Sequence, residues 1–204
     1  MSTQTKTTGL VAESKARQEE MRSILVFYGF NDYPKDIRDV LTRLNEKHAG
    51  RYTPLIEPHF TAIACDIRLG DVPRFKERLQ EIHAEMGQFR IDVSGISHFE
   101  GPMGKIVFLN VKRSAPVLAA HERLSELLRT EFPESKISDF YSKEKYTPHF
   151  TLALYIKEES VFNDFTGEMK RVITDFSQNI NAVKLVVLPP GQKIGPVEWE
   201  YKIK

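Results

Sequence analysis

The sequence predicts an α+β protein in which antiparallel β-sheets are covered by helices. Short runs rich in Val, Ile, Phe and Tyr, typical of strands, alternate with segments whose apolar residues recur at helical spacing. Several strands are separated only by turns containing Gly or Pro, which favours hairpins and therefore antiparallel pairing. The chain has 204 residues, of which 41% are hydrophobic and 28% are charged. These values are close to globular averages and suit one domain or two small lobes that share a core.

The first half of the chain contains predicted strands and two predicted helices. The strands are expected at residues 23–30, 59–67, 89–99 and 106–111. A helix begins at Pro34, and its apolar residues recur at helical spacing, at Ile37, Val40, Leu41 and Leu44. A second helix begins at Asp71 and Pro73 and ends at Gly87. The strand over residues 89–99 alternates apolar and polar residues, which indicates that one face is buried.

The second half repeats this pattern. Ser114 and Pro116 begin a helix whose apolar face includes Leu118, Leu124, Leu127 and Leu128. A polar loop is expected over residues 133–145, a strand over 149–156 and a helix over 161–176. Two final strands, 181–188 and 197–203, are separated by Pro189, Pro190 and Gly191 and are expected to form a closing hairpin.

Residues 1–21 are expected to form a solvated tail, helical from residue 11 to 21, with a single domain over residues 22–204. The segment is rich in Thr, Ser and Gln and lacks the apolar core of a secretory signal. No apolar run approaches the roughly 20 residues that span a bilayer, so no membrane partner is expected. Cys65 is the one cysteine of the chain. A disulfide within one chain is therefore excluded, which fits a reducing compartment such as the cytoplasm or the nucleus.

The formal net charge is +1, so the chain has no surplus of Lys and Arg of the kind that duplex binding requires. A small nucleotide, or one end of a nucleic acid, needs only a local positive site. The charge balance therefore argues against strong duplex binding and leaves a small nucleotide or a nucleic-acid end open as a ligand.

The tetrapeptide Pro-His-Phe-Thr occurs twice, at residues 58–61 and 148–151, each time at the start of a predicted strand. Residues i and i+2 of a strand point to the same face. His59 therefore shares a face with Thr61, and His149 shares a face with Thr151. Two such faces turned toward each other would form a cleft lined by two imidazoles and two hydroxyls.

Such a cleft suits in-line displacement at phosphorus. An imidazole titrates near pH ~6.5, so one can accept a proton while the other donates one. The first activates the incoming oxygen and the second protonates the leaving oxygen. Threonine hydroxyls can hydrogen-bond the non-bridging oxygens. A strained cyclic phosphodiester needs little more, and no metal is required to generate the nucleophile.

The two H-x-T motifs, each followed by an apolar residue, resemble those of the two-histidine (2H) phosphoesterase superfamily, in its 2′-5′ RNA ligase-like and cyclic phosphodiesterase branch. Residues 96–128 and 182–196 are similar to that family's middle segment and closing strands, and the resemblance covers roughly residues 23–203. Many members carry an aliphatic residue where this chain has Phe60 and Phe150, a conservative change on the buried face.

The resemblance implies a bilobal fold with two antiparallel sheets, outer helices, pseudo-twofold symmetry and an active-site groove between the lobes. It implies that His59 and His149 are the catalytic acid and base, and that Thr61 and Thr151 bind phosphate. The implied substrates are 2′,3′-cyclic nucleotides, RNA ends, ADP-ribose cyclic phosphate or 2′-5′ linked oligonucleotides. A metal-independent phosphodiesterase without a cofactor, acting as a monomer, is expected.

Four further residues are predicted to contact substrate. Phe99 can stack on a base, as can Tyr28 and Trp199, although aromatic residues in apolar strands usually belong to the core. Lys105 follows a Gly-rich turn and can meet a phosphate. The family's segment before the second motif often carries a basic or aromatic residue, and Lys145 and Tyr146 occupy that place here.

The remaining histidines and the cysteine are expected to be structural. His48 and His83 are predicted to lie on helix surfaces and His121 to be partly buried on a helix, while His98 lies near enough to a turn to reach the cleft. Cys65 has the same parity as His59 and would share its face, far along the strand, but is expected to be a packed thiol. No H-x-x-x-H or C-x-x-C spacing indicates zinc.

Two other functions remain open at this point. The chain can be a nucleotide- or RNA-end-binding module of the same fold without turnover. It can also be a scaffold in which the repeated tetrapeptide is coincidental. Retention of both histidines and both threonines favours the enzyme.

Overall fold

The computed structural model describes residues 20–50, 57–172, 175–192 and 195–204. The strands are β1 Met21–Gly29, β2 His59–Arg68, β3 Phe89–Phe99, β4 Lys105–Val111, β5 Lys136–Ile137, β6 His149–Ile156, β7 Phe176–Ile180, β8 Ala182–Val187 and β9 Val197–Lys202. The helices are α2 Lys35–Lys47, α3 Val72–Met86, α4 Ala115–Glu131 and α5 Glu159–Val172, with short 3-10 helices η1 Leu69–Asp71 and η2 Asp139–Tyr141. No described helix is long and apolar enough to cross a membrane.

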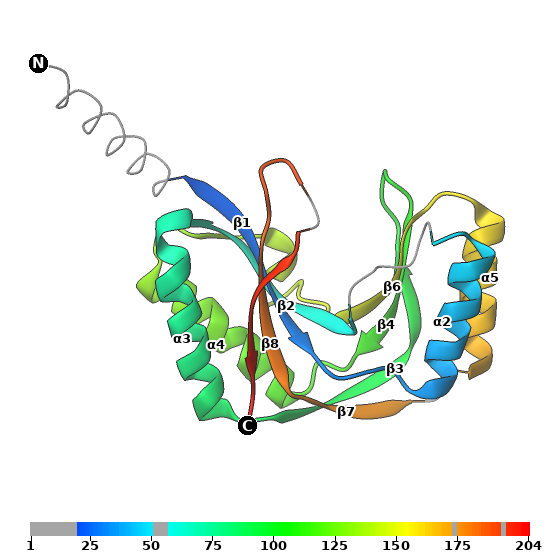
Figure 1. The fold of residues 1–204 in the computed structure, drawn as a ribbon, viewed down its shortest axis with the longest axis horizontal. Coiled ribbons are helices and arrows are strands. Elements are labelled where there is room, and N and C mark those ends of the chain that lie inside the picture. The colour runs from blue at the N-terminus through cyan, green and yellow to red at the C-terminus, as the bar shows by residue number, and fades with distance from the viewer. Residues whose placement is uncertain (1–19, 51–56, 173–174, 193–194) are drawn as a thin grey trace, which may run out of the picture.

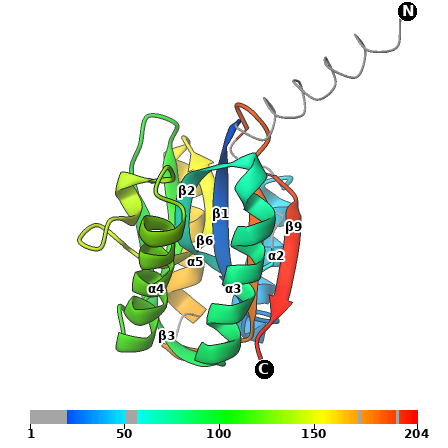
Figure 2. The ribbon, with the colours of Figure 1, turned by 90° about the vertical axis from the view of Figure 1, so that its left-hand side faces the viewer.

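The strands form one antiparallel sheet in the order β7-β3-β4-β6-β2-β1-β8-β9, with β5 paired to β2 outside this sequence. The α+β class and the antiparallel pairing predicted from the sequence are therefore confirmed. The first half-sheet, β2-β1-β8-β9, lies beside α3 and α4, and the second, β6-β4-β3-β7, lies beside α2 and α5 (Figures 1 and 2). The sheet curls between its two halves, and the right-handed twist between neighbouring strands contributes to this curvature.

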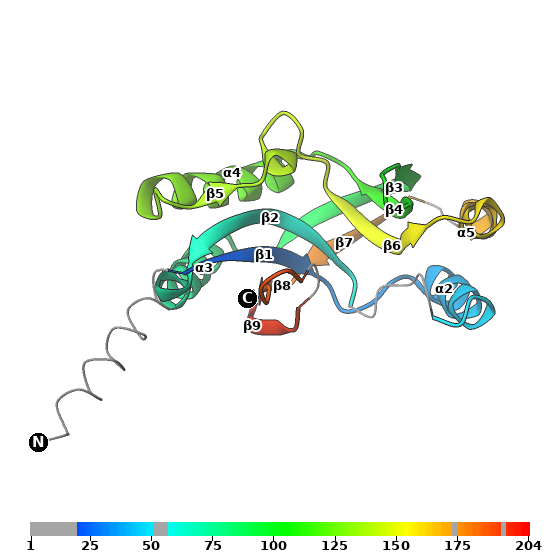
Figure 3. The same ribbon diagram turned by 90° about the horizontal axis from the view of Figure 1, so that it is seen from above.

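The two half-sheets meet at one residue pair, Phe60 of β2 opposite Phe150 of β6. Both side chains are fully buried, and their ring centroids lie 5.6 Å apart in an edge-to-face arrangement. On either side of this pair the strands diverge, as the view from above shows (Figure 3). The two predicted sheets are thus continuous through a single aromatic contact, and the core below it is shared by both halves.

An extra residue follows the threonine of each motif. On β2, Thr61 lies opposite Phe27 and Ile63 lies opposite Val26, so Ala62 is a bulge. On β6, Thr151 lies opposite Phe108 and Ala153 lies opposite Val107, so Leu152 is the equivalent bulge. A bulge reverses the alternation of faces beyond it. A bulge at the same position in both strands supports the predicted pseudo-twofold symmetry.

The bulge at Ala62 corrects the predicted face of Cys65. Residues after the bulge exchange faces, so Cys65 points to the core with Ile63 and Ile67 and does not share the face of His59. The thiol is buried, as predicted, and burial raises its pKa to about 12. It is therefore a packed thiol without thiolate character at neutral pH.

The main differences from the predicted elements lie in connections. The segment predicted as a loop over residues 133–145 contains the short strand β5 and η2, because Ile137 pairs with Cys65 of β2. The helix predicted over residues 161–176 ends at Val172, and Phe176–Ile180 forms the edge strand β7. Most of the predicted N-terminal tail lies outside the described residues, and Met21 already belongs to β1.

Candidate active site

The register of β2 and β6 brings the two motifs together. Because Phe60 lies opposite Phe150 in an antiparallel pair, residue 59 falls opposite residue 151 and residue 61 opposite residue 149. Each histidine therefore stands across from the threonine of the other motif. The four side chains share the face opposite the buried Phe60 and Phe150, and all four are only partly buried. The two histidines are therefore diagonal neighbours, one on each side of the Phe60–Phe150 pair.

Each imidazole is held by a backbone carbonyl two residues before it. His59 Nδ1–H donates to the Glu57 carbonyl at 2.8 Å, and His149 Nδ1–H donates to the Thr147 carbonyl at 2.7 Å. A carbonyl only accepts, so this bond places the proton of the neutral ring on Nδ1. Nε2 of both rings is then the nitrogen available for proton transfer. The two rings are thus held by the same kind of bond.

A phenylalanine from the neighbouring strand supports each histidine. The Phe27 ring lies 4.1 Å from that of His59, and the Phe108 ring lies 4.9 Å from that of His149, centroid to centroid. Phe27 and Phe108 occupy equivalent positions, each opposite the motif threonine. The sequence reasoning missed both. The signal was present, because each is preceded by valine in a strand that comes before a motif.

Burial lowers the pKa of both histidines below the usual 6.5. The bond to the Glu57 carbonyl opposes this effect at His59, but the positive charges of Lys184 and of a protonated His149 lower its pKa further. At His149 only the bond to Thr147 opposes burial. Each ring is therefore mainly neutral at pH 7 in the free protein. The charge of a protonated His149 affects the pKa of His59 because the two rings are near each other.

The backbone at the β2 bulge is held from below by two buried side chains. His121 Nδ1–H donates to the Ala62 carbonyl at 2.8 Å, and the Tyr146 hydroxyl donates to the Thr61 carbonyl at 3.3 Å. The two rings are stacked with centroids 3.9 Å apart. Tyr146 is 1% exposed, so it cannot contact substrate as predicted. It supports Thr61 from the core side.

Tyr141 of η2 is a third residue that the sequence reasoning missed. The residue is half-buried, and its hydroxyl interacts with the Thr61 side chain. Burial raises the pKa of Tyr141, and the bond to Thr61 partly offsets that rise. The hydroxyl thus stays protonated at neutral pH. A protonated Tyr141 hydroxyl can donate to the Thr61 hydroxyl and so orient it.

Replacing Tyr141 with phenylalanine is expected to reduce turnover of a cyclic phosphate about fivefold. One hydrogen bond contributes about 1 kcal/mol net, and 1.36 kcal/mol corresponds to a tenfold change in rate. Steady-state kinetics of Y141F would measure the change. Y201F is the matched control, because Tyr201 stacks on Trp199 and packs against the core. Equal losses in both variants would contradict a role for the Tyr141 hydroxyl.

The other residues predicted to contact substrate lie in different surroundings. Phe99 is 38% exposed and lies edge-on to His149, with ring centroids 5.1 Å apart, so it remains a candidate platform for a base. Lys105 faces α5 instead, where its Nζ lies 2.7 Å from Glu159 and 4.1 Å above the Phe162 ring. It does not reach the groove, and the prediction for it was wrong. Lys145 is exposed in the connection before β6, with its amide bonded to the Ser142 carbonyl.

The remaining histidines are structural, but two of them are more buried than predicted. His83 is fully buried, and its Nε2 accepts from the Tyr28 hydroxyl at 2.8 Å. His48 is 8% exposed and lies 3.2 Å from Asp164, so neither is a surface histidine. His121 is buried, as described above. His98 packs edge-on against Phe162 of α5, with ring centroids 4.9 Å apart, and so points away from the groove.

Of the other two aromatic candidates, Tyr28 is 1% exposed and cannot stack on a base. Trp199 is half-buried, packs against the core and stacks on Tyr201. Within the described ranges, no three His, Cys, Asp or Glu side chains are grouped so as to hold a metal ion.

Comparison with known proteins identifies the family. A sequence model of the 2′-5′ RNA ligase superfamily matches residues 33–191, a range that contains both H-x-T motifs. The chain belongs to this superfamily. Membership in the 2′-5′ RNA ligase superfamily confirms the resemblance found in the sequence. A search of curated protein sequences gives no significant match.

Solved structures share the fold of this 2′-5′ RNA ligase superfamily member at low sequence identity. TT0787 of Thermus thermophilus superposes with a TM-score of 0.58 and 16% identity, over 89% of this chain and 97% of that chain. E. coli LigT complexed with NADP+ gives 0.51 and 15%, over 90% and 98%. The MHV ns2 PDE domain gives 0.50 and 15%, over 82% and 99%. The likeness spans nearly all of each relative and confirms the bilobal α+β fold.

Proposed function

We propose that this protein is a metal-independent phosphodiesterase that opens 2′,3′-cyclic phosphates, or cleaves 2′-5′ linkages, in nucleotides or RNA ends. Its family supports phosphodiesterase chemistry in general. The observation that carries the proposal is the crossed arrangement of the two motifs, with each histidine opposite the other motif's threonine. Nucleotide binding by a relative, LigT complexed with NADP+, agrees with a nucleotide substrate.

The geometry supports in-line hydrolysis of a cyclic phosphate. One imidazole takes a proton from water through Nε2 as the water oxygen forms a bond to phosphorus. The bond from phosphorus to the 2′ or 3′ oxygen breaks, and the other imidazole donates its proton to that leaving oxygen. Thr61 and Thr151 donate hydrogen bonds to the non-bridging oxygens, whose negative charge is concentrated in the transition state. The anionic substrate raises the pKa of a neighbouring imidazole and so favours the one protonated ring that the reaction needs.

Turnover of 2′,3′-cyclic AMP and of an oligonucleotide ending in a cyclic phosphate, both in EDTA, tests the proposal. Release of the monophosphate, followed by chromatography, is the expected result. Binding without release would indicate a nucleotide- or RNA-end-binding module. Neither binding nor release would indicate a scaffold. Turnover that EDTA abolishes would contradict the metal-independent mechanism.

The rate of the reaction is expected to have a bell-shaped pH dependence with its kcat/KM maximum below pH 6.5. One ring must be neutral and the other charged, so the rate falls below the pKa of the base and above the pKa of the acid. Both pKa values are lowered in the free protein, which moves both limbs of the profile toward acid. The kcat profile should lie at higher pH, because bound phosphate raises the pKa of an imidazole.

Initial rates from pH 4.5 to 9 at subsaturating and saturating substrate would measure the two profiles. A rate of either kind that rises continuously across this range would rule out a protonated imidazole as the acid.

A further inference from the structure

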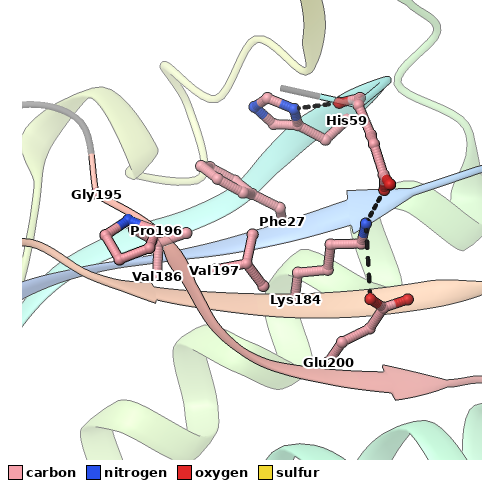
Figure 4. Close-up of a pocket in the computed structure, with 9 residues that line it drawn as sticks. Phe27, His59, Lys184, Val186, Gly195, Pro196, Val197 and Glu200 are labelled. Atoms are coloured by element: carbon pink, nitrogen blue, oxygen red, sulfur yellow. Dashed lines mark hydrogen bonds and ion pairs between the residues drawn. The ribbon is translucent and has the colours of Figure 1, made fainter. Parts of the chain in front are cut away.

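The groove continues beyond His59 into a pocket of about 410 Å³. The pocket lies over β1, β8 and β9, on the side of His59 away from β6, and Figure 4 shows the side chains that line it. The lining residues are Phe27, Glu57, His59, Lys184, Val186, Gly195, Pro196, Val197 and Glu200. A pocket of this size, directly beside a catalytic ring, is suited to hold the group attached to the scissile phosphate.

The walls of this pocket are apolar, and its polar groups gather on one side. Phe27 and Val186 belong to a small buried cluster that is separate from the main core and sits beneath the pocket. Val197, across the pocket on β9, is 42% exposed. Apolar side chains of this kind can contact the face of an aromatic heterocycle. A nucleobase therefore matches the walls better than a chain of phosphates or a sugar alone.

The polar side contains one ammonium between two carboxylates. Lys184 is 8% exposed, and its Nζ donates to Glu57 and lies 3.8 Å from Glu200 (Figure 4). Lys202 pairs with Glu200 on the same strand. Among the described residues of the pocket, the positive charge is thus matched by carboxylates. The pocket has no surplus cation for a second phosphate, but it has carboxylate oxygens that can accept further hydrogen bonds.

The opposite end of the groove has a different chemistry. The contacts of His149 there are the rings of Phe99 and Phe108. The two groups attached to a bound phosphate would therefore meet different side chains at the two ends of the groove. Among the described residues, the His59 end presents an ammonium and two carboxylates that can hydrogen-bond to a base.

We infer that the pocket beside His59 is a base-selective subsite that prefers guanine to uracil. The Watson–Crick edge of guanine has two adjacent N–H donors next to a carbonyl oxygen, which matches a carboxylate next to an ammonium. Uracil has one N–H between two carbonyl oxygens, so one oxygen faces a carboxylate without a donor. This inference rests on the proposed function for the position of the phosphate, and it adds the identity of the attached nucleoside.

Equilibrium binding tests the subsite without requiring turnover. Guanosine 3′-monophosphate is expected to bind at least about tenfold more tightly than uridine 3′-monophosphate, since hydrogen bonds to charged groups are stronger than those between neutral groups. In E200Q the ratio of the two dissociation constants should fall to about three or less, because guanine loses a charged acceptor and the new amide N–H can donate to the uracil oxygen. E198Q is the matched control, because Glu198 lies near Lys76 of α3, outside the pocket lining. Titration calorimetry would give all six dissociation constants.

Equal binding of the two nucleotides to the wild-type protein would overturn the subsite, as would a preference that E200Q retains. Hydrolysis of 2′,3′-cyclic GMP and 2′,3′-cyclic UMP gives a separate readout of the proposed function. If neither is hydrolysed, the proposed function is wrong. The ratio of dissociation constants still shows whether the subsite prefers guanine. If both are hydrolysed with equal kcat/KM and bind equally, the function stands and the subsite is wrong.

Discussion

Replacing either His59 or His149 with alanine is expected to reduce kcat for a cyclic phosphate by about 10²- to 10⁴-fold, the usual contribution of a general acid or base. Each ring presents Nε2 to the groove because its Nδ1–H is bonded to a carbonyl, and no other described imidazole faces the site. KM should change less than kcat, because the threonines still hold the phosphate. Single-turnover and steady-state rates of H59A and H149A would measure the losses.

The double variant should be little slower than the slower single variant, since residues that act as one unit are not additive. H98A is the matched control, because His98 is partly exposed and contacts α5 on the other side of the sheet. It should retain nearly full activity. If H59A and H149A kept rates within a few fold of the wild type, the two-histidine mechanism would be refuted.

Removing the hydroxyl of Thr61 or Thr151 is expected to slow turnover by roughly 10- to 1000-fold, judging from single lost oxyanion donors. The effect should appear in kcat, because the hydroxyls interact most strongly with the charge of the transition state. T61V and T151V keep the β-branched shape that suits a strand and remove only the donor. T61S and T151S, which restore the donor, should recover most of the rate.

A loss that the serine variants do not rescue would indicate that the methyl group, and hence packing, is the important feature. Thermal unfolding of all four variants provides the control for folding. Thr61 has the additional bond to Tyr141, so T61V is expected to be the more damaging of the two valine variants.

The placement of the four motif side chains on one face could be predicted because the motif obeys the simplest local rule of a strand. His and Thr at i and i+2 share a face, and two copies at strand starts were enough to place four side chains together. The same rule failed for Cys65, since the bulge at Ala62 reversed the faces beyond it. A bulge depends on the partner strand, so alternation within one segment does not reveal it.

Features that depend on distant pairings could not be predicted. Phe27 meets His59 only because β1 pairs with β2, and Tyr141 meets Thr61 only because β5 attaches its connection to the same strand. The burial of His83 follows from Tyr28, 55 positions away along the chain. In each contact, the residues next to either partner in the sequence do not indicate the other partner. Lys105 is a contact that was predicted and not found. A lysine after a Gly-rich turn does not show which face of the sheet its side chain will take.

The strand order has a consequence for synthesis on the ribosome. In the half-sheet that contains His59, β1 is covered on one side by β2 and on the other by β8, which follows the second motif in the chain. Until β8 emerges, a nascent chain therefore has an unpaired edge of β1, which is open to association with other strands. The wall that contains Lys184 is also added only then. Prematurely terminated chains that already contain both histidines should consequently be prone to aggregation and should lack the Lys184 side of the pocket beside His59.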